Sequence, residues 1–393
     1  MPVAGRELAI SRHARSVAAV REAAERGLSA VIDLATTISE VPAPTKDEGR
    51  RAELVDRSFR QAGLIDVRRD DIHNVVARIP GRTRGRALLL AAHLDTVFDL
   101  DTPLDVATTG NRVAGPGIGD NSVGVAAVLS LPTLLRDLGI VPAVDLLLTG
   151  NVGEEGLGNL AGIKRVMDDH PEIGAVVAIE GHNLGRVTHV AVGSVRLRVT
   201  VTGPGGHSWG DFGNPNAIHA AARIIADLDR LPLPQQPKTT LSVGLIEGGI
   251  SVNTIAPSAS FVLDLRSTDS LTLERLKGRV TAALRPTDER LMVEVDTLGE
   301  RPAGFLPISS RIVQTGIEVL RLLGHAASAD ASSTDANPAI NRGLPAICVG
   351  LTTGGNVHTT AEFIDVPPVA SGIAQLVLLV LALGDELAAG SVS

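Results

Sequence analysis

Residues 87–95 read ALLLAAHLD, an apolar run that ends directly in a His-Leu-Asp cluster. Two further apolar runs, 143–150 and 174–180, also lead into acidic residues. Short apolar runs bounded by turn residues are typical of buried strands. In open α/β sheets the functional site lies beyond the carboxyl ends of the strands. These three segments therefore predict neighbouring strands whose polar ends can converge at one edge of a sheet.

Helical stretches alternate with the strand-like runs from residue 15 to about residue 180. Segments 31–39 and 50–64 have the periodicity of helices, whereas residues 74–79 (NVVARI) have that of a strand. This alternation predicts an α/β fold with a doubly wound sheet.

The pattern changes between residues 193 and 298. The order there is strand, helix, two strands, helix, strand, which is typical of a small independent α+β domain. The α/β pattern then resumes with a helix over 308–324 and a strand over 345–351. We therefore expect a discontinuous metal-binding α/β domain of residues 1–192 and 299–393, interrupted by an inserted βαββαβ dimerisation or lid domain of residues 193–298.

The composition excludes several classes of function. The chain has 393 residues, with 36 Lys and Arg against 44 Asp and Glu, and its net charge is −8. It has no basic run of the kind that binds nucleic acid. A single cysteine, Cys348, excludes a disulfide framework and a cysteine-based zinc cluster. Any metal must therefore be held by histidines and carboxylates.

The chain also lacks the usual signals for export or membrane insertion. Its first residues have no apolar core of a secretory signal, and its longest apolar run, 376–383, is far shorter than the ~20 residues that span a bilayer. That run predicts a buried C-terminal helix. We expect a cytoplasmic protein without a membrane partner.

Four separated clusters contain side chains of the metal-ligand type. Each one alone is typical of an ordinary strand end or solvated loop, but all four follow a strand or a glycine-rich turn of the same predicted sheet. Zn²⁺ accepts imidazole nitrogen and carboxylate oxygen, so the set is compatible with a zinc site. The clusters are HLD (93–95), GIGDNS (117–122), GEEG (153–156) with IEG (179–181), and NVHTT (356–360).

The ordered motifs HLDTV, GPGIGDNS, GEEG, IEG, GPGGHS and HTTAEF resemble those of the M20 family of dinuclear zinc peptidases and deacylases. The resemblance covers almost the whole chain, including the insert. It implies two divalent metal ions, with zinc expected and cobalt or manganese as alternatives. His93 and Glu180 would bind one ion, Glu155 and His358 would bind the other, and Asp120 would bridge them.

The resemblance also implies catalytic roles. Glu154, which is next to the predicted ligand Glu155, would be the general base. It would take a proton from a water between the metals, leaving a hydroxide, and pass that proton to the leaving amine. Asp95 lies two residues after His93, on the same side of an extended chain, and would hold the imidazole. His207 in GPGGHS would reach the active site of a second subunit and polarise the scissile carbonyl. This trans role requires a homodimer formed through the insert.

Two residues of the insert, Asn253 and Arg266, match substrate-binding positions of the family, and two glycines of a later loop are further candidates. Asn253 would contact the substrate carbonyl, and the guanidinium of Arg266 would bind its free carboxylate. Gly354 and Gly355 would let backbone approach the substrate. Ser332, Ser333 and the Asn121-Ser122 pair depart from common family patterns, so the substrate is not identified by the motifs.

The expected reaction is hydrolysis of an amide bond in a small peptide or N-acyl amino acid. A glutamate at position 180 favours a carboxypeptidase or deacylase, because relatives with aspartate there are usually aminopeptidases or dipeptidases. The GPGGHSWGDFG and SSTDAN segments resemble peptidase T-like tripeptidases, so an aminopeptidase is the alternative. A non-catalytic metal-containing binding protein ranks lower. A Ser-His-Asp hydrolase that uses a serine of SSTDAN (332–337) also ranks low, because that segment has no G-x-S-x-G turn.

Overall fold

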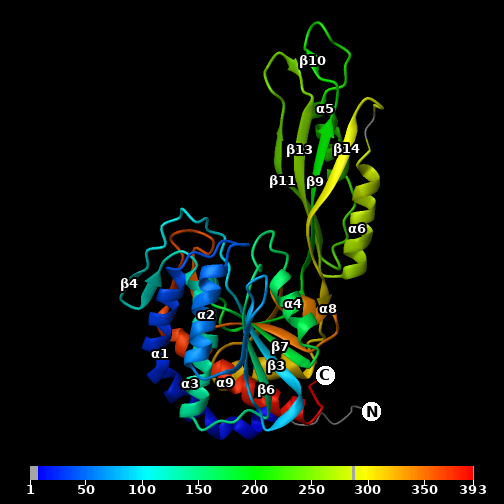
Figure 1. Cartoon of the computed structure of the whole chain (residues 1–393). Coiled ribbons are helices and arrows are strands. Elements are labelled where there is room, and N and C mark those ends of the chain that lie inside the picture. The colour runs from blue at the N-terminus through cyan, green and yellow to red at the C-terminus, as the bar shows by residue number, and fades with distance from the viewer. Residues whose placement is uncertain (1–7, 286–287, 393) are drawn as a thin grey trace, which may run out of the picture. The chain divides into compact units, whose positions relative to one another are not determined.

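The computed structural model describes residues 8–285 and 288–392. The chain divides into two compact units. Unit 1 combines Met1–Ala191 with Leu306–Ser393, and unit 2 is Val192–Phe305. Figure 1 shows the elements of both units, coloured along the chain.

Unit 1 is built on a mixed sheet with the strand order β1-β2-β6-β3-β7-β17-β8, and β16 pairs with β8. The central strands β6, β3, β7 and β17 are parallel, whereas β1, β2 and β8 join by antiparallel pairs. The predicted α/β sheet is thus confirmed, with a parallel centre that is flanked on each side by antiparallel pairs. Its strands are β1 (Ile65–Arg69), β2 (Val75–Ile79), β3 (Thr83–His93), β6 (Val144–Asn151), β7 (Ile173–Glu180), β8 (Arg186–Ala191), β16 (Ser328–Ser332) and β17 (Ala346–Gly350).

Helices cover both faces of this sheet because successive side chains of its strands point to opposite sides. Leu88 and Leu90 of β3 pack into one apolar core, and Leu89 packs into the other. The first core includes residues of α1, α2, α3, α7 and α9, and the second includes residues of α4 and α8. The helical segments of unit 1 are η1 (Ala9–Ser16), α1 (Val17–Ser39), α2 (Gly49–Gln61), η2 (Ile118–Ser122), α3 (Val123–Asp137), α4 (Ala161–Asp169), α7 (Arg311–Leu322), α8 (Asn337–Asn341) and α9 (Val366–Ala388).

Two helical segments, Ile118–Asp137 and Val366–Ala388, are long and apolar enough to cross a membrane by length and composition. In the structure, 83% and 72% of their most apolar windows are buried inside the protein. Packing of this kind is expected for the core helices of a large domain. The prediction that residues 376–383 belong to a buried helix is confirmed, and the cytoplasmic location stays a prediction.

A second, smaller sheet in unit 1 connects segments that are distant in sequence. Its strand order is β18-β19-β5-β4, and β19 pairs with β5 so that Phe363 faces Ala114. The sequence analysis missed these strands because each is only two or three residues long. This sheet brings the segment after β17 next to the loop that carries Asp120. Its strands are β4 (Ala107–Thr109), β5 (Arg112–Ala114), β18 (Gly354–Gly355) and β19 (Phe363–Asp365).

Unit 2 is a four-stranded antiparallel sheet with the order β11-β13-β9-β14. Residues of α5 and α6 pack with alternate residues of β9 and β13 in one apolar core. The strand order leaves β11 and β14 as the two edges of the sheet. The βαββαβ order matches the sequence prediction. Its elements are β9 (Gly193–Thr202), β10 (Gly206–His207), α5 (Ala217–Asp229), β11 (Thr239–Gly248), β12 (Thr254–Ile255), β13 (Ser258–Ser267), α6 (Ser270–Ala283), β14 (Met292–Arg301) and β15 (Gly304–Phe305).

The end of unit 2 differs from the predicted boundary at residue 298. Strand β14 continues to Arg301, which pairs with Ser194 of β9. A bulge between Thr297 and Gly299 shifts the register within β14, and the strand continues beyond it. The compact unit therefore extends to Phe305.

Candidate metal centre

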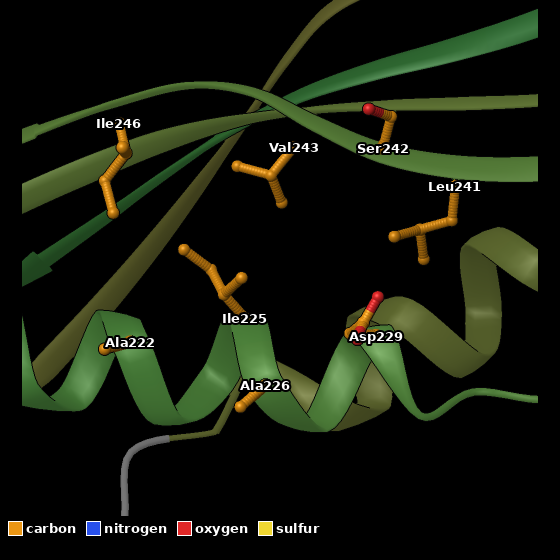
Figure 2. A pocket seen from close by; sticks show the side chains of 8 residues that line it. All are labelled: Ala222, Ile225, Ala226, Asp229, Leu241, Ser242, Val243 and Ile246. Carbon is orange, nitrogen blue, oxygen red and sulfur yellow. The ribbon is translucent and has the colours of Figure 1, made fainter.

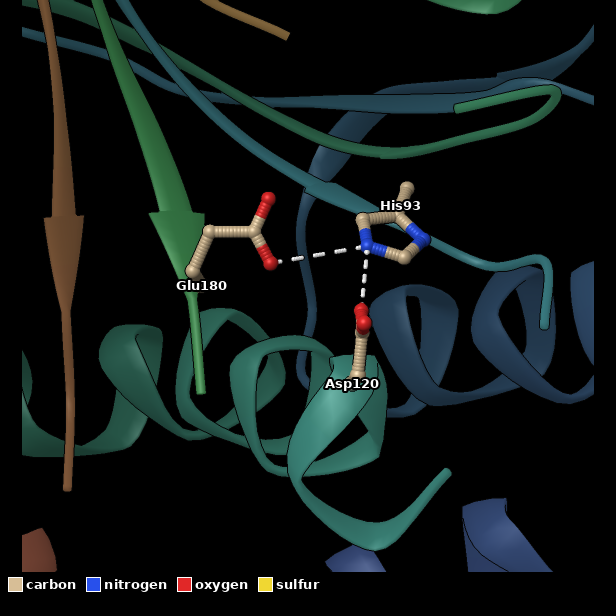
Figure 3. Close-up of side chains that lie close together, drawn as sticks. All are labelled: His93, Asp120 and Glu180. Atoms are coloured by element: carbon tan, nitrogen blue, oxygen red, sulfur yellow. Dashed lines mark ion pairs between the residues drawn. The ribbon is translucent and has the colours of Figure 1, made fainter. Parts of the chain in front are cut away.

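Two neighbouring parallel strands of unit 1 deliver His93 and Glu180 to the same edge of the sheet. Strand β3 ends at His93 and strand β7 ends at Glu180. His93 Nε2 lies 3.6 Å from Glu180 Oε2 and 3.0 Å from Asp120 Oδ1 (Figure 3). The side chains that the sequence analysis assigned to the first metal thus converge.

Asp120 lies between the two histidines. It belongs to the turn 117–122, where its non-helical backbone, with φ −112° and ψ 85°, interrupts the helical path into α3. One carboxylate oxygen, Oδ1, faces His93, and the other, Oδ2, lies 3.1 Å from His358 Nε2. His358 Nε2 is also 3.1 Å from Glu155 Oε1. Each oxygen of the Asp120 carboxylate therefore faces a different histidine, as expected for a carboxylate that bridges two metal ions.

Asp95 holds the loop after β6. Its carboxylate accepts hydrogen bonds from the backbone N–H of Glu154 (2.9 Å) and Glu155 (2.8 Å), and from Thr45 Oγ1 (2.9 Å). The shorter contact of His93 Nδ1 is with the backbone oxygen of Asp95, at 3.1 Å, and the carboxylate lies at 3.5 Å. The carboxylate of Asp95 therefore holds the backbone of the two glutamates, whereas its contact with the imidazole is made chiefly by its backbone oxygen, and its role in holding the imidazole stays a prediction.

The ionisable groups perturb one another strongly. Burial and the nearby charge of Asp120 raise the pKa of Glu180 to about 7, and hydrogen bonds to Asp120 and Glu155 raise the pKa of His358 to about 10. Burial opposes ionisation of Asp120, but the hydrogen bond from His358 and the nearby imidazole of His93 hold its pKa well below its usual range. Burial disfavours the charged form of His93, yet the carboxylates of Glu180 and Asp120 raise its pKa well above the usual value.

The donor set fits two divalent cations. Nδ1 of His93 faces a carbonyl, which leaves the lone pair of Nε2 for another partner. Nε2 is buried and makes no hydrogen bond of good geometry with any described residue, although it lies among carboxylate oxygens. A bound cation would satisfy this nitrogen and offset the repulsion between the carboxylates.

Three groups of side chains among the described residues have ligand atoms within 4.8 Å of one another. Two of these groups share Asp120, and the third includes Glu154, so the geometry permits Glu154 to be either a base or an alternative ligand. The groups are His93, Asp120 and Glu180; Asp120, Glu155 and His358; and His93, Glu154 and Glu155.

Metal affinity is expected to rise with pH. With a pKa of about 10, His358 is protonated at neutral pH when no ion is bound, and an ion that binds to it must displace this proton. Between pH 6 and pH 9 the apparent affinity of that ion should rise about tenfold per pH unit. Competition with a chelator, corrected for the protonation of the chelator, measures this slope. A flat profile would contradict the role of His358 as a ligand.

The candidate residues of unit 2 form two separate groups. His207 and Asn253 lie at the same end, because β10 pairs with β12 and Ser208 N donates to Asn253 O at 3.0 Å. Arg266 pairs with Ser194 near the other end of β13, and its Nε donates to Asp264 Oδ2 at 2.7 Å. Unit 2 of one chain therefore does not bring Asn253 and Arg266 together.

The glycines after β17 have a structural reason of their own. A Cβ on Gly354 would lie 2.1 Å from Phe363 O and 2.8 Å from His182 Cε1, and a Cβ on Gly355 would lie 3.2 Å from the ring of Phe363. Close packing inside the small sheet thus accounts for small residues here. Their contact with a substrate stays a prediction.

The sequence analysis missed some residues that support the cluster. One of them is His182, which follows Glu180 by two positions and had no predicted role. Glu362 in the quoted HTTAEF motif had no predicted role either. Glu362 is fully buried beside the Asp120 turn and contacts His182. The available signal for Glu362 was its place in the HTTAEF motif, four residues after the predicted ligand His358.

Comparisons with known proteins agree with this architecture. Residues 191–291 match the profile of the Peptidase dimerisation domain, and residues 74–186 match that of Peptidase family M28. A provisionally assigned succinyl-diaminopimelate desuccinylase of Mycobacterium tuberculosis is 25% identical over 354 residues, covering 87% of this chain and 95% of that protein.

Solved structures share the fold. A tripeptidase from Staphylococcus aureus has a TM-score of 0.77 at 21% identity, covering 90% of this chain and 97% of that one. A dinuclear metal-binding M20 peptidase from Bacillus subtilis has a TM-score of 0.64 at 14% identity, covering 92% and 99%.

The fold, the histidine–carboxylate cluster and these matches define a metal-dependent hydrolase of the metallopeptidase and amidohydrolase class. Within that class, these matches support an M20 family peptidase or deacylase.

Proposed function

We propose that the protein is a dizinc hydrolase that cleaves an amide bond in a small peptide or an N-acyl amino acid. The observation that carries this proposal is the position of the Asp120 carboxylate, whose two oxygens face His93 and His358 at 3.0 and 3.1 Å. Two imidazoles and three carboxylates are ligands that zinc accepts, and cobalt or manganese could occupy the same donors.

His93 and Glu180 would hold one ion, Glu155 and His358 would hold the other, and Asp120 would contact both. Paired ions, when bound, would lower the pKa of a water molecule and polarise the substrate carbonyl. Glu154 would accept the proton of the attacking water and donate it to the leaving amine. In support, Glu154 is buried and one of its oxygens lies within 4.8 Å of ligand atoms of His93 and Glu155.

His207 is suited to donate a hydrogen bond to a substrate carbonyl. Its Nδ1 faces the backbone N–H groups of Trp209 (3.2 Å) and Gly210 (3.3 Å), and it can accept hydrogen bonds from them only if it is unprotonated. Neutral His207 then carries its proton on Nε2. A donor aimed at the oxygen that gains charge stabilises the transition state of amide hydrolysis.

We further propose a homodimer formed through unit 2. Arg266 lies eight residues along β13 from Ser258, or about 27 Å at ~3.4 Å per residue, and Asn253 lies beyond the Ser258 end. A small substrate can contact both side chains only if they come from different copies of the chain. The match of residues 191–291 to a peptidase dimerisation domain supports this assembly.

Strand β11 offers a surface for such pairing. It is one of the two edges of the sheet, and exposed edge strands readily pair with another chain. Between it and α5 lies a cavity of about 520 Å³, lined by apolar side chains that include Ile225, Leu241 and Val243 (Figure 2). Ile246 in the same lining is 59% exposed. A second copy would bury these side chains.

The carboxypeptidase or deacylase direction is favoured by Glu180 and by the relative assigned as a desuccinylase. The decisive experiment is a hydrolysis panel on zinc-loaded protein, with N-acyl amino acids, dipeptides and tripeptides whose amino or carboxyl termini are free or blocked. We expect activity that is lost when the substrate carboxylate is blocked and that withstands acylation of the amine.

Three other outcomes of the panel would redirect the proposal. Loss of activity on blocking the amine would favour a peptidase T-like aminopeptidase. No hydrolysis under zinc, cobalt or manganese would favour a metal-containing binding protein. Activity that survives exhaustive chelation would refute the metal mechanism.

A further inference from the structure

Glu362 is a carboxylate buried beside the metal centre that belongs to none of its ligand groups. Its side chain has 0% exposure, and it follows His358 by four residues. An ionised carboxylate is costly to bury unless its oxygens receive hydrogen bonds. The donors that surround Glu362 therefore show what its charge holds in place.

Three donors are backbone N–H groups of the turn that carries Asp120. Gly117 N donates to Glu362 Oε2 at 3.1 Å, and Gly119 N and Asp120 N donate to Oε1 at 3.0 and 2.8 Å. Hydrogen bonds to a charged acceptor are stronger than those between neutral groups. The side chain of Glu362 thus holds the backbone at three positions of the turn, Gly117, Gly119 and Asp120.

Glu362 also connects the segments of two other ligands. His182 Nε2, two residues after Glu180, lies 2.9 Å from Glu362 Oε1. The backbone oxygen of Glu362 accepts from Gly115 N at 2.9 Å, and its backbone N–H donates to Thr359 O at 3.1 Å, next to His358. Loops carrying Asp120, Glu180 and His358 therefore meet at one buried residue.

The space around this contact is filled. A Cβ on Gly119 would lie 2.0 Å from His182 Nε2 and 2.7 Å from Glu362 Oε1. No side chain fits there without displacing the pair. The turn, the imidazole and the carboxylate are packed as one unit, so a change in Glu362 must be transmitted to Asp120.

We propose that Glu362 is a positioning residue that aims the Asp120 carboxylate so that its two oxygens can serve two metal ions at once. Glu362 contacts Asp120 only through the backbone, so it acts on the ions through another residue. This inference rests on the proposed dinuclear function.

Glu362→Gln tests the inference with little change of shape. Glutamine offers one acceptor oxygen where glutamate offers two, and its NH₂ group would face a backbone N–H of the turn. We expect the first Co²⁺ ion to bind as in the wild type. The dissociation constant of the second should rise about 10- to 100-fold, the range for residues that orient metal ligands.

The readouts are Co²⁺ titration by calorimetry, the visible absorption of the cobalt-loaded protein and the magnetic coupling between its two ions by electron paramagnetic resonance. Glu386→Gln is the matched control. Glu386 is also buried in unit 1, at 1% exposure, and accepts from Arg311 at 3.0 Å, but it contacts none of the metal-binding loops. We expect it to lower thermal stability without changing cobalt stoichiometry or spectra.

His182→Ala provides a second variant should Glu362→Gln fail to fold. It keeps the three backbone contacts of Glu362 and removes only the imidazole, so we expect a smaller loss of affinity for the second ion, below tenfold. Unchanged titration and spectra in a folded Glu362→Gln or His182→Ala protein, or equal changes in Glu386→Gln, would overturn the inference. Fewer than two ions bound by the wild type would instead refute the proposed dinuclear function.

Discussion

Glu154→Gln is expected to lower turnover of a small amide substrate by about 10²- to 10⁴-fold, the contribution typical of a general base. The amide side chain has nearly the same shape as the carboxylate but cannot take a proton from water. The backbone N–H of Glu154, which Asp95 accepts, is unchanged by this substitution. We therefore expect both metal ions to remain bound, as measured by elemental analysis after gel filtration.

Glu155→Gln is the control in the neighbouring position. Glu155 belongs to two of the three groups of ligand atoms, and its Oε1 lies 3.1 Å from His358 Nε2, whereas Glu154 belongs only to the group with His93 and Glu155. If the roles are as proposed, Glu155→Gln loses an ion together with activity, and Glu154→Gln loses activity alone. Metal loss in Glu154→Gln would make it a ligand, and near-normal turnover would remove the base assignment.

Mixing two inactive variants is expected to restore activity if His207 acts across a dimer. His207→Ala should lower turnover about 10²- to 10³-fold, as loss of an oxyanion donor does. In a mixed dimer with Glu154→Gln, one site combines the intact Glu154 of one chain with the intact His207 of the other. Random exchange gives half mixed dimers with one good site each, so activity should recover to about a quarter of the wild type.

The mixing experiment has its own controls. The subunits are unfolded together and refolded, or co-expressed with two tags, so that mixed dimers can be purified. His207→Ala mixed with Glu155→Gln should also recover activity. In that mixed dimer, one active site combines the intact Glu155 of one chain with the intact His207 of the other. No recovery in purified mixed dimers would place His207 in the site of its own chain or outside it.

The short strands and their consequences could not be predicted from sequence. Strands β5, β18 and β19 have two or three residues each, too few for a periodic pattern, yet their pairing connects the His358 segment to the Asp120 turn. Their register depends on backbone hydrogen bonds between segments about 250 residues apart. The role proposed for Glu362 depends on the same pairing, which brings its carboxylate to the Asp120 turn. Its donors there are backbone N–H groups, which almost every residue type has, so no residue of the turn identifies the contact.

The predicted site residues fall into two classes for a related reason. His93 and Glu180 follow long apolar strands, and parallel strands that are neighbours in a sheet bring their carboxyl ends together. Arg266 also ends a strand, but an antiparallel sheet sends alternate strand ends in opposite directions, and it lies far from Asn253. A motif match alone contains no information about which end of a sheet a residue reaches.

The amino-acid sequence by itself determined the α/β framework, the inserted βαββαβ segment and the kind of ligands available, because apolar periodicity and side-chain chemistry are local properties. Only the tertiary structure decided which ligands meet. Asp120 lies between two histidines that are 265 positions apart, and a buried glutamate holds its turn. Long-range backbone pairing and the need to satisfy a buried charge set these distances, and neither is encoded within any single stretch of the chain.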